Sequence, residues 1–492
     1  MDIVFLSTEA VPFAKTGGLG DVCGSLPATL ADAGHRVALI MPAFRCIRQT
    51  GASIDVTDIS FAIAIGERII GARVLKSKLP GSLVDVYFVD QPQYYDRDGL
   101  YGDSRGDHPD NCERFAFFCR AALQVIGRIS PQVDIVHCND WQTGLVPAYM
   151  RYDFESHAWM KHARSVMTVH NLAYQGRFWH YDMPLTGLGW ERFTSVGVEF
   201  YGSLNFLKSG ILLADTITTV SPTYAKEIQT PLHGCDLDAV LRSRAHRLQG
   251  ITNGIDDSIW NPATDPHLTQ TYDVDTWRQG KAANKHSLQA EFGLAINPDL
   301  PLVGLVGRLA DQKGWDLVLE VLQWHLEQNR PVQWVILGTG DPRYHDALSA
   351  FASRYGDRFA LRLGFSDALA HRIEAGADMF LMPSRYEPCG LNQLYSLRYG
   401  TVPIVMATGG LADTVTDTHD LTLQNQTATG FHIHSFTAVA VDHVLGKSLA
   451  MRYHDPAAWA AIVERGMKAD WSWRKSALQY QEVYEETLSL AR

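Results

Sequence analysis

Near its beginning the chain places a glycine-rich loop between a predicted strand and a predicted helix. Residues 3–6 are a short continuous apolar run, which is typical of a buried parallel strand. Val22, Leu26 and Leu30 then recur every four residues and predict one face of a helix. The loop between them reads Lys-Thr-Gly-Gly-Leu-Gly-Asp over residues 15–21. A strand, loop and helix in this order indicate an α/β fold with a parallel sheet.

This loop has the chemistry of an anion site. A helix N-terminus offers free N–H groups and the positive end of the helix dipole, and a phosphate suits it. Gly17 and Gly18 permit close approach of a ligand, and Lys15 adds a positive charge. The dinucleotide fingerprint is excluded by Cys23, and no Gly-Lys-Ser/Thr of a P-loop follows. We therefore expect Lys15, Gly17, Gly18 and Asp21 to bind substrate; the alternative is an ordinary turn with a solvated lysine.

The same α/β pattern recurs along the chain in two halves. Apolar runs predict strands at residues 37–41, 133–137, 166–169, 217–220 and 248–251, and then at 302–306, 334–337, 361–363, 379–382 and 402–405. A polar, proline-containing stretch separates the halves. The fold class is therefore α/β with two doubly wound units, residues 1–255 and 256–469. The helical tail over 470–492 is expected to pack back on the first unit.

Polar side chains follow several predicted strands of the first half. Asp140 comes after one strand, His170 and Asn171 after the next, and Asn253 after the last. Ligands of open parallel sheets bind at these carboxyl ends, which favours a substrate site. A capping or core role for His170 and a simple Asn-Gly turn at Asn253 are the alternatives.

Residues 91–112 are polar and rich in glycine and tyrosine, which predicts a long loop. Tyr94 and Tyr95 within it can stack on a sugar face. The alternative, an exposed pair of turn aromatics, is equally consistent with the sequence.

Charged side chains also follow predicted strands in the second half. Arg308 and Lys313 share one loop, and two cations there suit a diphosphate, although surface charges are the alternative. Glu387 precedes another helix N-terminus, where it either favours the helix dipole or binds a sugar hydroxyl. Gly390 permits close approach, and Cys389 can be an inert small filler.

Composition narrows the partners and the compartment. The formal net charge is −11, which disfavours nucleic acid and is compatible with a neutral polysaccharide. Seven cysteines without a Cys-x-x-Cys indicate reduced thiols, with neither a disulfide framework nor a zinc site. No signal peptide and no apolar stretch of about 20 residues is visible, so no membrane partner is expected. These features predict a cytoplasmic protein, or a plastid protein if this is a mature form.

Several of these motifs, taken in order and at their spacing, resemble the bacterial glycogen synthase and plant starch synthase family over essentially the whole length. The motifs are Lys-Thr-Gly-Gly-Leu at 15–19, Asp-Trp at 140–141, His-Asn at 170–171, Arg308 with Lys313, Glu-Pro-Cys-Gly-Leu at 387–391 and Thr-Gly-Gly-Leu at 408–411. The resemblance implies the GT-B architecture, with two Rossmann-like domains facing across a cleft. It implies transfer of glucose from ADP-glucose to the non-reducing 4-OH end of an α-1,4-glucan with retention, without metal or other cofactor.

The resemblance also implies roles for single residues. Arg308 and Lys313 would clamp the pyrophosphate, and the Gly17–Gly18 backbone with Lys15 would stabilise the phosphates. Glu387 would hold the donor glucose, and His170 would contact it near the reacting centre. The remaining expected site residues either face the acceptor or bind substrate: Asp140 and Tyr95 on the acceptor side, and Asp21, Asn171, Asn253, Cys389, Gly390, Leu391, Thr408 and Gly409.

Two mechanisms of retention remain open from the sequence. The acceptor can attack on the face from which the diphosphate leaves, or a carboxylate can form a covalent intermediate. No obvious nucleophile is visible, which favours the first. The sequence departs from the family pattern in Gln142, in Met406 and in the loop 235–239, and the last two bear on acceptor handling and rate. Tyr395 stands where the wider superfamily often has a second glutamate.

Three rival functions differ from this reading. The donor can be UDP-glucose instead, since base recognition is not readable here. A glucan phosphorylase would need a longer chain and a pyridoxal lysine motif. A non-catalytic glucan-binding relative should have lost clamp residues, whereas Lys15, His170, Arg308, Lys313 and Glu387 are all present. Oligomeric state stays open.

Overall fold

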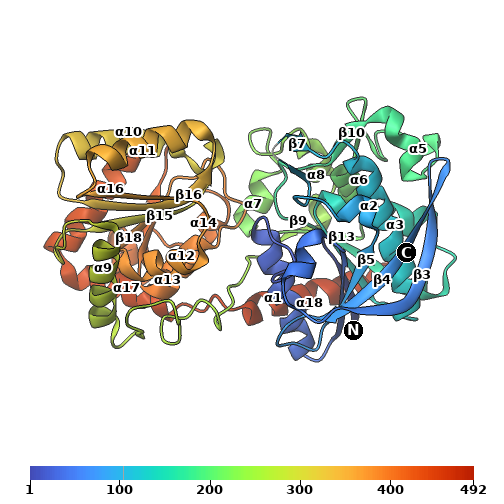
Figure 1. Ribbon diagram of the computed structural model, residues 1–492, viewed down its shortest axis with the longest axis horizontal. Helices are drawn as coiled ribbons and strands as arrows, with labels where there is room; N and C mark the ends of the chain where they lie inside the picture. The colour runs from blue at the N-terminus through green and yellow to red at the C-terminus, as the bar shows by residue number, and fades with distance from the viewer. Residues whose placement is uncertain (104, 492) are drawn as a thin grey trace. The chain divides into compact units, whose positions relative to one another are not determined.

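The computed structural model describes residues 1–103 and 105–491, which form two compact units (Figure 1). The first unit comprises Met1–Gly254 and the segment from Trp473 onward, and the second comprises Ile255–Ser472. The division thus falls at the predicted Asn-Gly turn rather than within the polar stretch 257–272 that follows it. None of the helices in the described residues is long and apolar enough to cross a membrane.

The first unit is built on a nine-stranded sheet with the order β14-β13-β9-β8-β1-β2-β5-β4-β3. Its strands are β1 (Asp2–Leu6), β2 (Arg36–Pro42), β3 (Asp55–Ile65), β4 (Arg68–Lys78), β5 (Asp85–Asp90), β8 (Ile135–Asn139), β9 (Arg164–Val169), β13 (Thr216–Thr219) and β14 (Leu248–Gly250). All pairings from β14 to β5 are parallel, whereas β4 runs antiparallel to β5 and β3. The carboxyl ends of the parallel strands therefore share one edge.

Helices and short strands complete this unit. The helices are α1 (Gly18–Asp32), α2 (Pro92–Tyr95), α3 (Asn111–Ile129), α4 (Val146–Tyr152), α5 (Met183–Thr186), α6 (Phe206–Leu213), α7 (Pro222–Glu227), α8 (Asp238–Ser243) and α18 (Trp473–Ser489). A three-stranded sheet contains β10 (Arg177–Trp179), β12 (Ser203–Asn205) and β11 (Glu199–Phe200), and a hairpin contains β6 (Gly102–Asp103) and β7 (Gly106–Asp107).

The predicted single long loop over residues 91–112 is wrong. The segment contains α2, the β6–β7 hairpin and the first turn of α3. Pro92 stands in the first turn of α2, and the side chain of Gln91 accepts a hydrogen bond from Gln93 N at 3.0 Å. A proline at that position and a capping side chain are standard starts of a helix, and polarity alone hid them.

The last helix packs on the first unit although it follows the second in the chain. In Figure 1 the red α18 lies beside the blue α1, and the two helices are in contact. The Tyr484 hydroxyl hydrogen-bonds His137 Nδ1 at 2.7 Å, and Thr487 hydrogen-bonds Thr216 at 2.7 Å. Helix α18 thus covers the sheet between β8 and β13.

His137 predicts how the stability of this unit depends on pH. Burial lowers the pKa of His137 to about 3, with a smaller contribution from His170. Below about pH 6.5 the imidazole of His137 is protonated in the unfolded chain but stays neutral in the folded chain. The contribution of His137 to the free energy of unfolding is therefore complete above pH 6.5 and is lost as the pH falls toward 3. Between pH 7.5 and 5 the loss is about 2 kcal/mol.

We therefore expect His137→Gln to weaken the dependence of the unfolding free energy on pH between pH 7.5 and pH 5. Urea unfolding at pH 7.5 and pH 5 should show that the wild-type chain loses about 2 kcal/mol more than the variant. The comparison uses only the difference between the two pH values, because the substitution itself can lower stability at both. Equal pH dependence in the two proteins would contradict the assignment.

The second unit contains a six-stranded sheet, all parallel, with the order β17-β16-β15-β18-β19-β20. Its strands are β15 (Leu302–Leu309), β16 (Gln333–Gly340), β17 (Phe359–Leu363), β18 (Met379–Met382), β19 (Val402–Met406) and β20 (Phe431–Ile433). Its helices are α9 (Trp277–Phe292), α10 (Trp315–Glu327), α11 (Pro342–Arg354), α12 (Asp367–Gly376), α13 (Asn392–Tyr399), α14 (Gly409–Thr414), α15 (Asp420–Gln424), α16 (Ala438–His454) and α17 (Pro456–Lys468).

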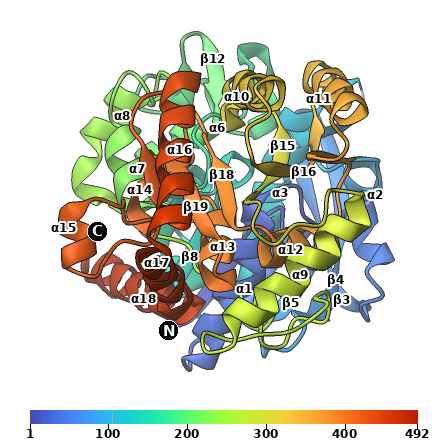
Figure 2. The same ribbon diagram turned by 90° about the vertical axis from the view of Figure 1, so that its left-hand side faces the viewer.

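Successive side chains of β16 face two separate cores, as the period of a strand requires. Trp334 and Ile336 belong to the core under α10, α11 and α16, whereas Val335 and Leu337 belong to the core under α9 and α12. Helix α9 lies along α12 on that second face (Figure 2). Because this sheet is buried on both faces, the sequences of its strands are continuous apolar runs.

Candidate functional site

Predicted site residues of the first unit lie at the carboxyl ends of β1, β8 and β9. Asp140 follows β8, and its Oδ1 accepts a hydrogen bond from His170 N at 2.7 Å. His170 Nε2 hydrogen-bonds Asn139 Oδ1 at 2.9 Å, and Asn139 Nδ2 donates to Leu6 O at 3.1 Å. The chain of contacts therefore ties three neighbouring strand ends together, as the sequence predicts for a parallel sheet.

Asp140 has a strained backbone and an altered carboxyl group. Its φ of 56° with ψ of −176° is a conformation that essentially only glycine adopts freely, and such strain concentrates at functional sites. The pKa of Asp140 is raised to about 7, chiefly by burial, which the N–H of His170 opposes and to which the charge of Glu9 adds a smaller contribution. Near neutral pH this carboxyl group can therefore both hold and release a proton.

His170 is held as a neutral ring. Burial lowers the pKa of His170 to about 3, so the imidazole carries no charge at neutral pH. Because Asn139 Oδ1 accepts a hydrogen bond, the proton of the neutral ring is assigned to Nε2, which leaves Nδ1 as an acceptor. This arrangement suits a contact with a sugar hydroxyl.

The glycine loop is shaped by a residue that the sequence did not single out. Gly17 is the residue before α1, and Lys15 Nζ forms an ion pair with Asp21 Oδ1 at 2.7 Å. The N–H groups of Thr16 and Gly17 both donate to Glu9 Oε2, at 2.5 and 3.2 Å. The expectation that the Gly17 N–H binds phosphate is therefore corrected, because that donor is engaged inside the protein. Gly18 is the first residue of α1.

The predicted contact of Tyr95 with a sugar is wrong. Tyr95 is 0% exposed, and its hydroxyl donates to Arg114 O at 3.0 Å. Tyr94 is also buried and hydrogen-bonds Glu113. The aromatic side chain of this segment that reaches the site loops is Tyr101, whose hydroxyl donates to Glu9 Oε1 at 2.7 Å.

Two predicted asparagines have different surroundings. Asn171 Oδ1 accepts a hydrogen bond from Ala173 N at 3.1 Å and so stabilises its own turn. Asn253 is buried just before the division between the units, and its Oδ1 has no hydrogen-bond partner among residues 1–103 and 105–491. An unsatisfied buried oxygen is unusual, which keeps Asn253 as a candidate substrate contact.

In the second unit, the residues predicted to hold phosphate and glucose are joined directly. Lys313 ends a short turn after β15, and its Nζ forms an ion pair with Glu387 Oε2 at 2.5 Å. Ser384 Oγ donates to the same oxygen at 3.0 Å. Arg308, near the end of β15, donates to Gln312 Oε1 at 3.2 Å. The end of β15 and the turn after it therefore carry both cations. Lys313 also orients the carboxylate of Glu387.

The turn around Glu387 packs against the start of α14 with no space for side chains. Gly410 N donates to Glu387 O and Pro388 O, each at 3.1 Å. Gly409 has a φ of +45°, and a Cβ there would lie 2.0 Å from Glu387 O. Cys389, Gly390, Leu391 and Thr408 lie in the same two segments, so the structure brings the predicted donor-side residues together.

The departures from the family pattern lie in and around the site as follows. Met406 is buried in the core at the end of β19, and Gln142 is buried in the turn after Asp140. Cys235 and Asp236 both have positive φ, and Cys235 O accepts a hydrogen bond from Gln175 at 2.8 Å. Nothing in the structure assigns these residues a direct contact with substrate.

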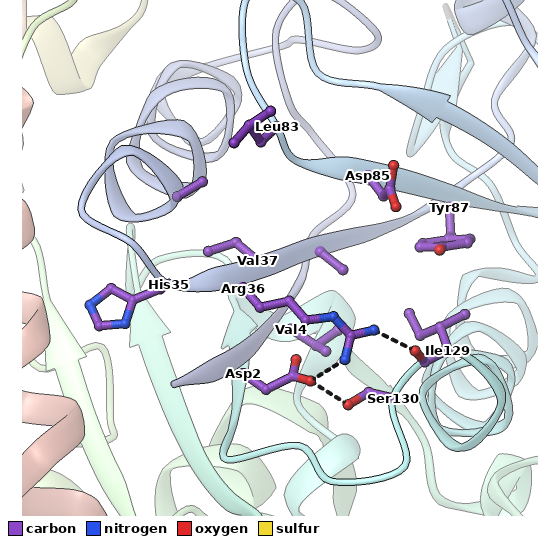
Figure 3. A pocket seen from close by; sticks show the side chains of 12 residues that line it. Asp2, Val4, His35, Arg36, Val37, Leu83, Asp85, Tyr87, Ile129 and Ser130 are labelled. Atoms are coloured by element: carbon purple, nitrogen blue, oxygen red, sulfur yellow. Dashed lines mark hydrogen bonds and ion pairs between the residues drawn. The ribbon is translucent and has the colours of Figure 1, made fainter.

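A pocket lies at the opposite edge of the first sheet and is separate from these residues. It surrounds the amino ends of β1, β2 and β5, where Arg36 donates to Asp2 at 2.6 Å and to Ile129 O at 2.7 Å (Figure 3). Ser130 also donates to Asp2. These polar groups are hydrogen-bonded to one another, so the pocket has a structural explanation.

Among the described residues, no group of three or more His, Cys, Asp or Glu side chains is placed to hold a metal ion.

Sequence reasoning missed Glu9, Tyr101, Asn139 and Ser384. Glu9, Asn139 and Ser384 each hydrogen-bond a predicted residue, and Tyr101 hydrogen-bonds Glu9. None of the four belongs to a motif of its own. Asn139 and Ser384 stand within three residues of a predicted site residue, so the position after a strand was the available signal. No signal in the sequence pairs Glu9 with Tyr101.

Comparison with known proteins gives consistent matches over both units. Two family models match, the starch synthase catalytic domain over residues 2–243 and glycosyl transferases group 1 over residues 288–447. A glycogen synthase of Rhodopirellula baltica is 53% identical over 501 residues, which covers 100% of this chain and 99% of that protein. A glycogen synthase of Syntrophotalea carbinolica is 47% identical over 490 residues, with 100% and 99% covered.

Solved structures agree with these matches. The catalytic domain of starch synthase IV from Arabidopsis thaliana, bound to ADP and acarbose, superposes with a TM-score of 0.91 at 32% identity and 99% coverage of both chains. Sucrose-phosphate synthase from Thermosynechococcus elongatus has a TM-score of 0.60 at 19% identity, with 100% of both chains covered, which is a likeness of fold alone.

Proposed function

This chain belongs to the glycogen and starch synthase family of GT-B glycosyltransferases, and we propose from that premise that it elongates an α-1,4-glucan with glucose from ADP-glucose. The family, the GT-B class and the glycosyltransferase activity predicted from the motifs are thereby confirmed. The choice of ADP-glucose is supported by the starch synthase IV structure, which is described as bound to ADP and acarbose. The products are ADP and a glucan that is longer by one residue.

The observation that carries the proposal is the pair of cations at the carboxyl end of β15. Arg308 lies near the end of β15, Lys313 ends the short turn that follows, and Lys313 contacts the carboxylate of Glu387 at 2.5 Å. A departing nucleoside diphosphate needs stabilisation of developing negative charge, and fixed cations supply it. In the proposed site these two cations hold the diphosphate, and Glu387 with the Cys389–Leu391 turn holds the glucose. A metal ion and other cofactors have no part in the proposed reaction.

The proposed mechanism retains the anomeric configuration by attack on the face from which the diphosphate leaves. The bond between glucose C1 and the diphosphate oxygen breaks, and a bond forms between C1 and O4 of the acceptor. The proton of that hydroxyl passes to the leaving phosphate oxygen. Glu387 Oε2 is already bound by Lys313 and Ser384, which makes it a poor nucleophile and supports this route over a covalent intermediate.

Roles in substrate binding are also proposed for residues of the first unit. Lys15 and Gly18 contribute to binding of the phosphates, and His170 contacts the glucose near C1. Asp140 faces the acceptor. Supporting contacts to substrate are proposed for Asp21, Asn171, Asn253, Thr408 and Gly409. No disulfide joins any of the seven cysteines, all of which lie in the described part of the chain, and this supports a reducing, cytoplasmic location as part of the same proposal. No nucleic-acid or membrane partner is proposed.

The test is release of nucleoside diphosphate from ADP-glucose and from UDP-glucose, each with and without glycogen or short malto-oligosaccharides. We expect ADP release that depends on glycogen and exceeds UDP release at least tenfold. Preference for UDP-glucose would overturn the donor while keeping the chemistry. Absence of release with both donors, together with retained glucan binding, would indicate a non-catalytic member of the family.

A further inference from the structure

Glu9 is a buried carboxylate whose hydrogen bonds converge on one loop. It is 3% exposed. Its Oε2 accepts from Thr16 N and Gly17 N at 2.5 and 3.2 Å, and its Oε1 accepts from Thr16 Oγ1 and the Tyr101 hydroxyl at 2.6 and 2.7 Å. Burial of a charge is costly unless it is fully hydrogen-bonded, and four donors satisfy that condition.

These contacts hold the loop in a particular state. With the N–H groups of Thr16 and Gly17 bound to Glu9, and Gly20 N bound to Gly17 O at 3.2 Å, the donors left for an anion at the start of α1 are the N–H groups of Gly18 and Leu19. Lys15 stands directly before the two fixed residues. A free glycine loop would sample many conformations, and fixing it in advance lowers the entropy cost of binding an anion.

Tyr101 connects the same carboxylate to the acceptor side. Its hydroxyl also hydrogen-bonds Thr8 at 2.7 Å, and its ring lies 6.3 Å from that of Trp141, the residue after Asp140. The Glu9 carboxylate therefore joins the end of β1, the glycine loop and the hairpin segment that carries Tyr101. Each of these elements borders the predicted site.

We propose that Glu9 is a positioning residue for the donor diphosphate. It acts through the glycine loop, which it fixes so that Lys15 and the first turn of α1 meet the phosphates. The inference rests on the proposed function, because it assumes that this loop contacts the donor. Tyr101 assists by holding one oxygen of the carboxylate.

The experiment compares Glu9→Ala, Glu9→Gln and Tyr101→Phe in the full chain. It measures kcat and KM for ADP-glucose, KM for glycogen, the Kd of ADP by calorimetry, and Tm. Glu9→Ala should raise the KM for ADP-glucose and the Kd of ADP roughly tenfold or more, with the KM for glycogen unchanged. Glu9→Gln keeps an oxygen for the two N–H groups and should stay within about threefold, and Tyr101→Phe should fall between the two.

Asp215→Ala is the matched control. Asp215 Oδ2 accepts hydrogen bonds from Ser165 N at 2.7 Å and Ser165 Oγ at 2.9 Å, so it makes the same kinds of contact at the amino edge of the sheet. It should lower Tm and leave both KM values unchanged. A purely structural role of Glu9 would produce that same pattern in Glu9→Ala and would overturn the proposal.

Lys15→Ala separates this proposal from the one on which it rests. If Lys15→Ala raises the KM for ADP-glucose and Glu9→Ala does not, the role of Glu9 is wrong and the site assignment stands. If neither changes it, the loop does not contact the donor and the proposed site fails. If Glu9→Ala does not fold, Tyr101→Phe decides, and an unchanged KM in that variant overturns the role of Glu9.

Discussion

Lys313→Ala is expected to lower kcat/KM for ADP-glucose by about a thousandfold, the upper range for loss of one preorganised charge contact in a transition state. The same change strands the Glu387 carboxylate, whose side chain is 7% exposed and loses its cation at 2.5 Å. Because an unpaired buried charge is costly, the second unit should also lose about 2 kcal/mol of unfolding free energy. Steady-state kinetics and urea unfolding measure the two effects.

Two further proteins separate charge stabilisation from simple loss of structure. The double variant Lys313→Ala, Glu387→Gln removes the stranded charge, so it should regain stability while remaining inactive. Arg372→Ala removes a partly exposed cation that pairs with Glu291 at 3.0 Å between α12 and α9, and it should change neither quantity appreciably. Wild-type turnover in Lys313→Ala would refute the role proposed for this side chain.

Gly410→Ala is expected to abolish most activity by a steric effect. A Cβ at this position would lie 2.2 Å from Cys389 O and 2.5 Å from Cys389 Cα, and backbone atoms cannot move aside cheaply. The Glu387 turn must shift, so we expect kcat/KM to fall at least a hundredfold, since small misplacements of reacting groups carry penalties of that size. The measurements are kcat/KM and the Tm of the variant.

Gly446→Ala is the matched control for that substitution. Gly446 lies inside α16 with nothing within 4 Å of the added methyl group, and alanine is the better helix former by up to about 1 kcal/mol. It should keep full activity with equal or higher Tm. If Gly410→Ala is as active as Gly446→Ala, the contact between α14 and the Glu387 turn does not support the site.

The sequence predicted most of the parallel strands, and it singled out the candidate donor-side residues, because both depend on local pattern. An apolar run followed by polar residues marks the carboxyl end of a parallel strand, and Arg308, Lys313 and Glu387 were found in this way. Pairing of Lys313 with Glu387 was not predicted, because it joins residues that are far apart in the chain. The left-handed backbone of Asp140 has no composition signal either, since it is imposed by the strands around it.

The error at Tyr95 has a different physical origin. An aromatic ring with a hydroxyl suits both a sugar surface and a core, and only packing decides between them. Here the ring lies in the core beside Phe44, with ring centroids 5.7 Å apart. Glu9 is the opposite case, a site residue that sequence analysis missed. No sequence pattern marks a buried carboxylate beside a loop, and only the structure shows its four hydrogen-bond donors.

The packing of α18 on the first unit imposes an order on biosynthesis. During translation the second unit is synthesised before Tyr484, which hydrogen-bonds His137. Residues 1–254 of the first unit are therefore made first, and until α18 is made their strands β8 and β13 are not covered by it. Most multidomain chains fold from the N-terminal domain onward, and this one is built to finish its first unit last. A released chain that ends before Trp473 should therefore contain a protease-resistant second unit and an incompletely folded first one.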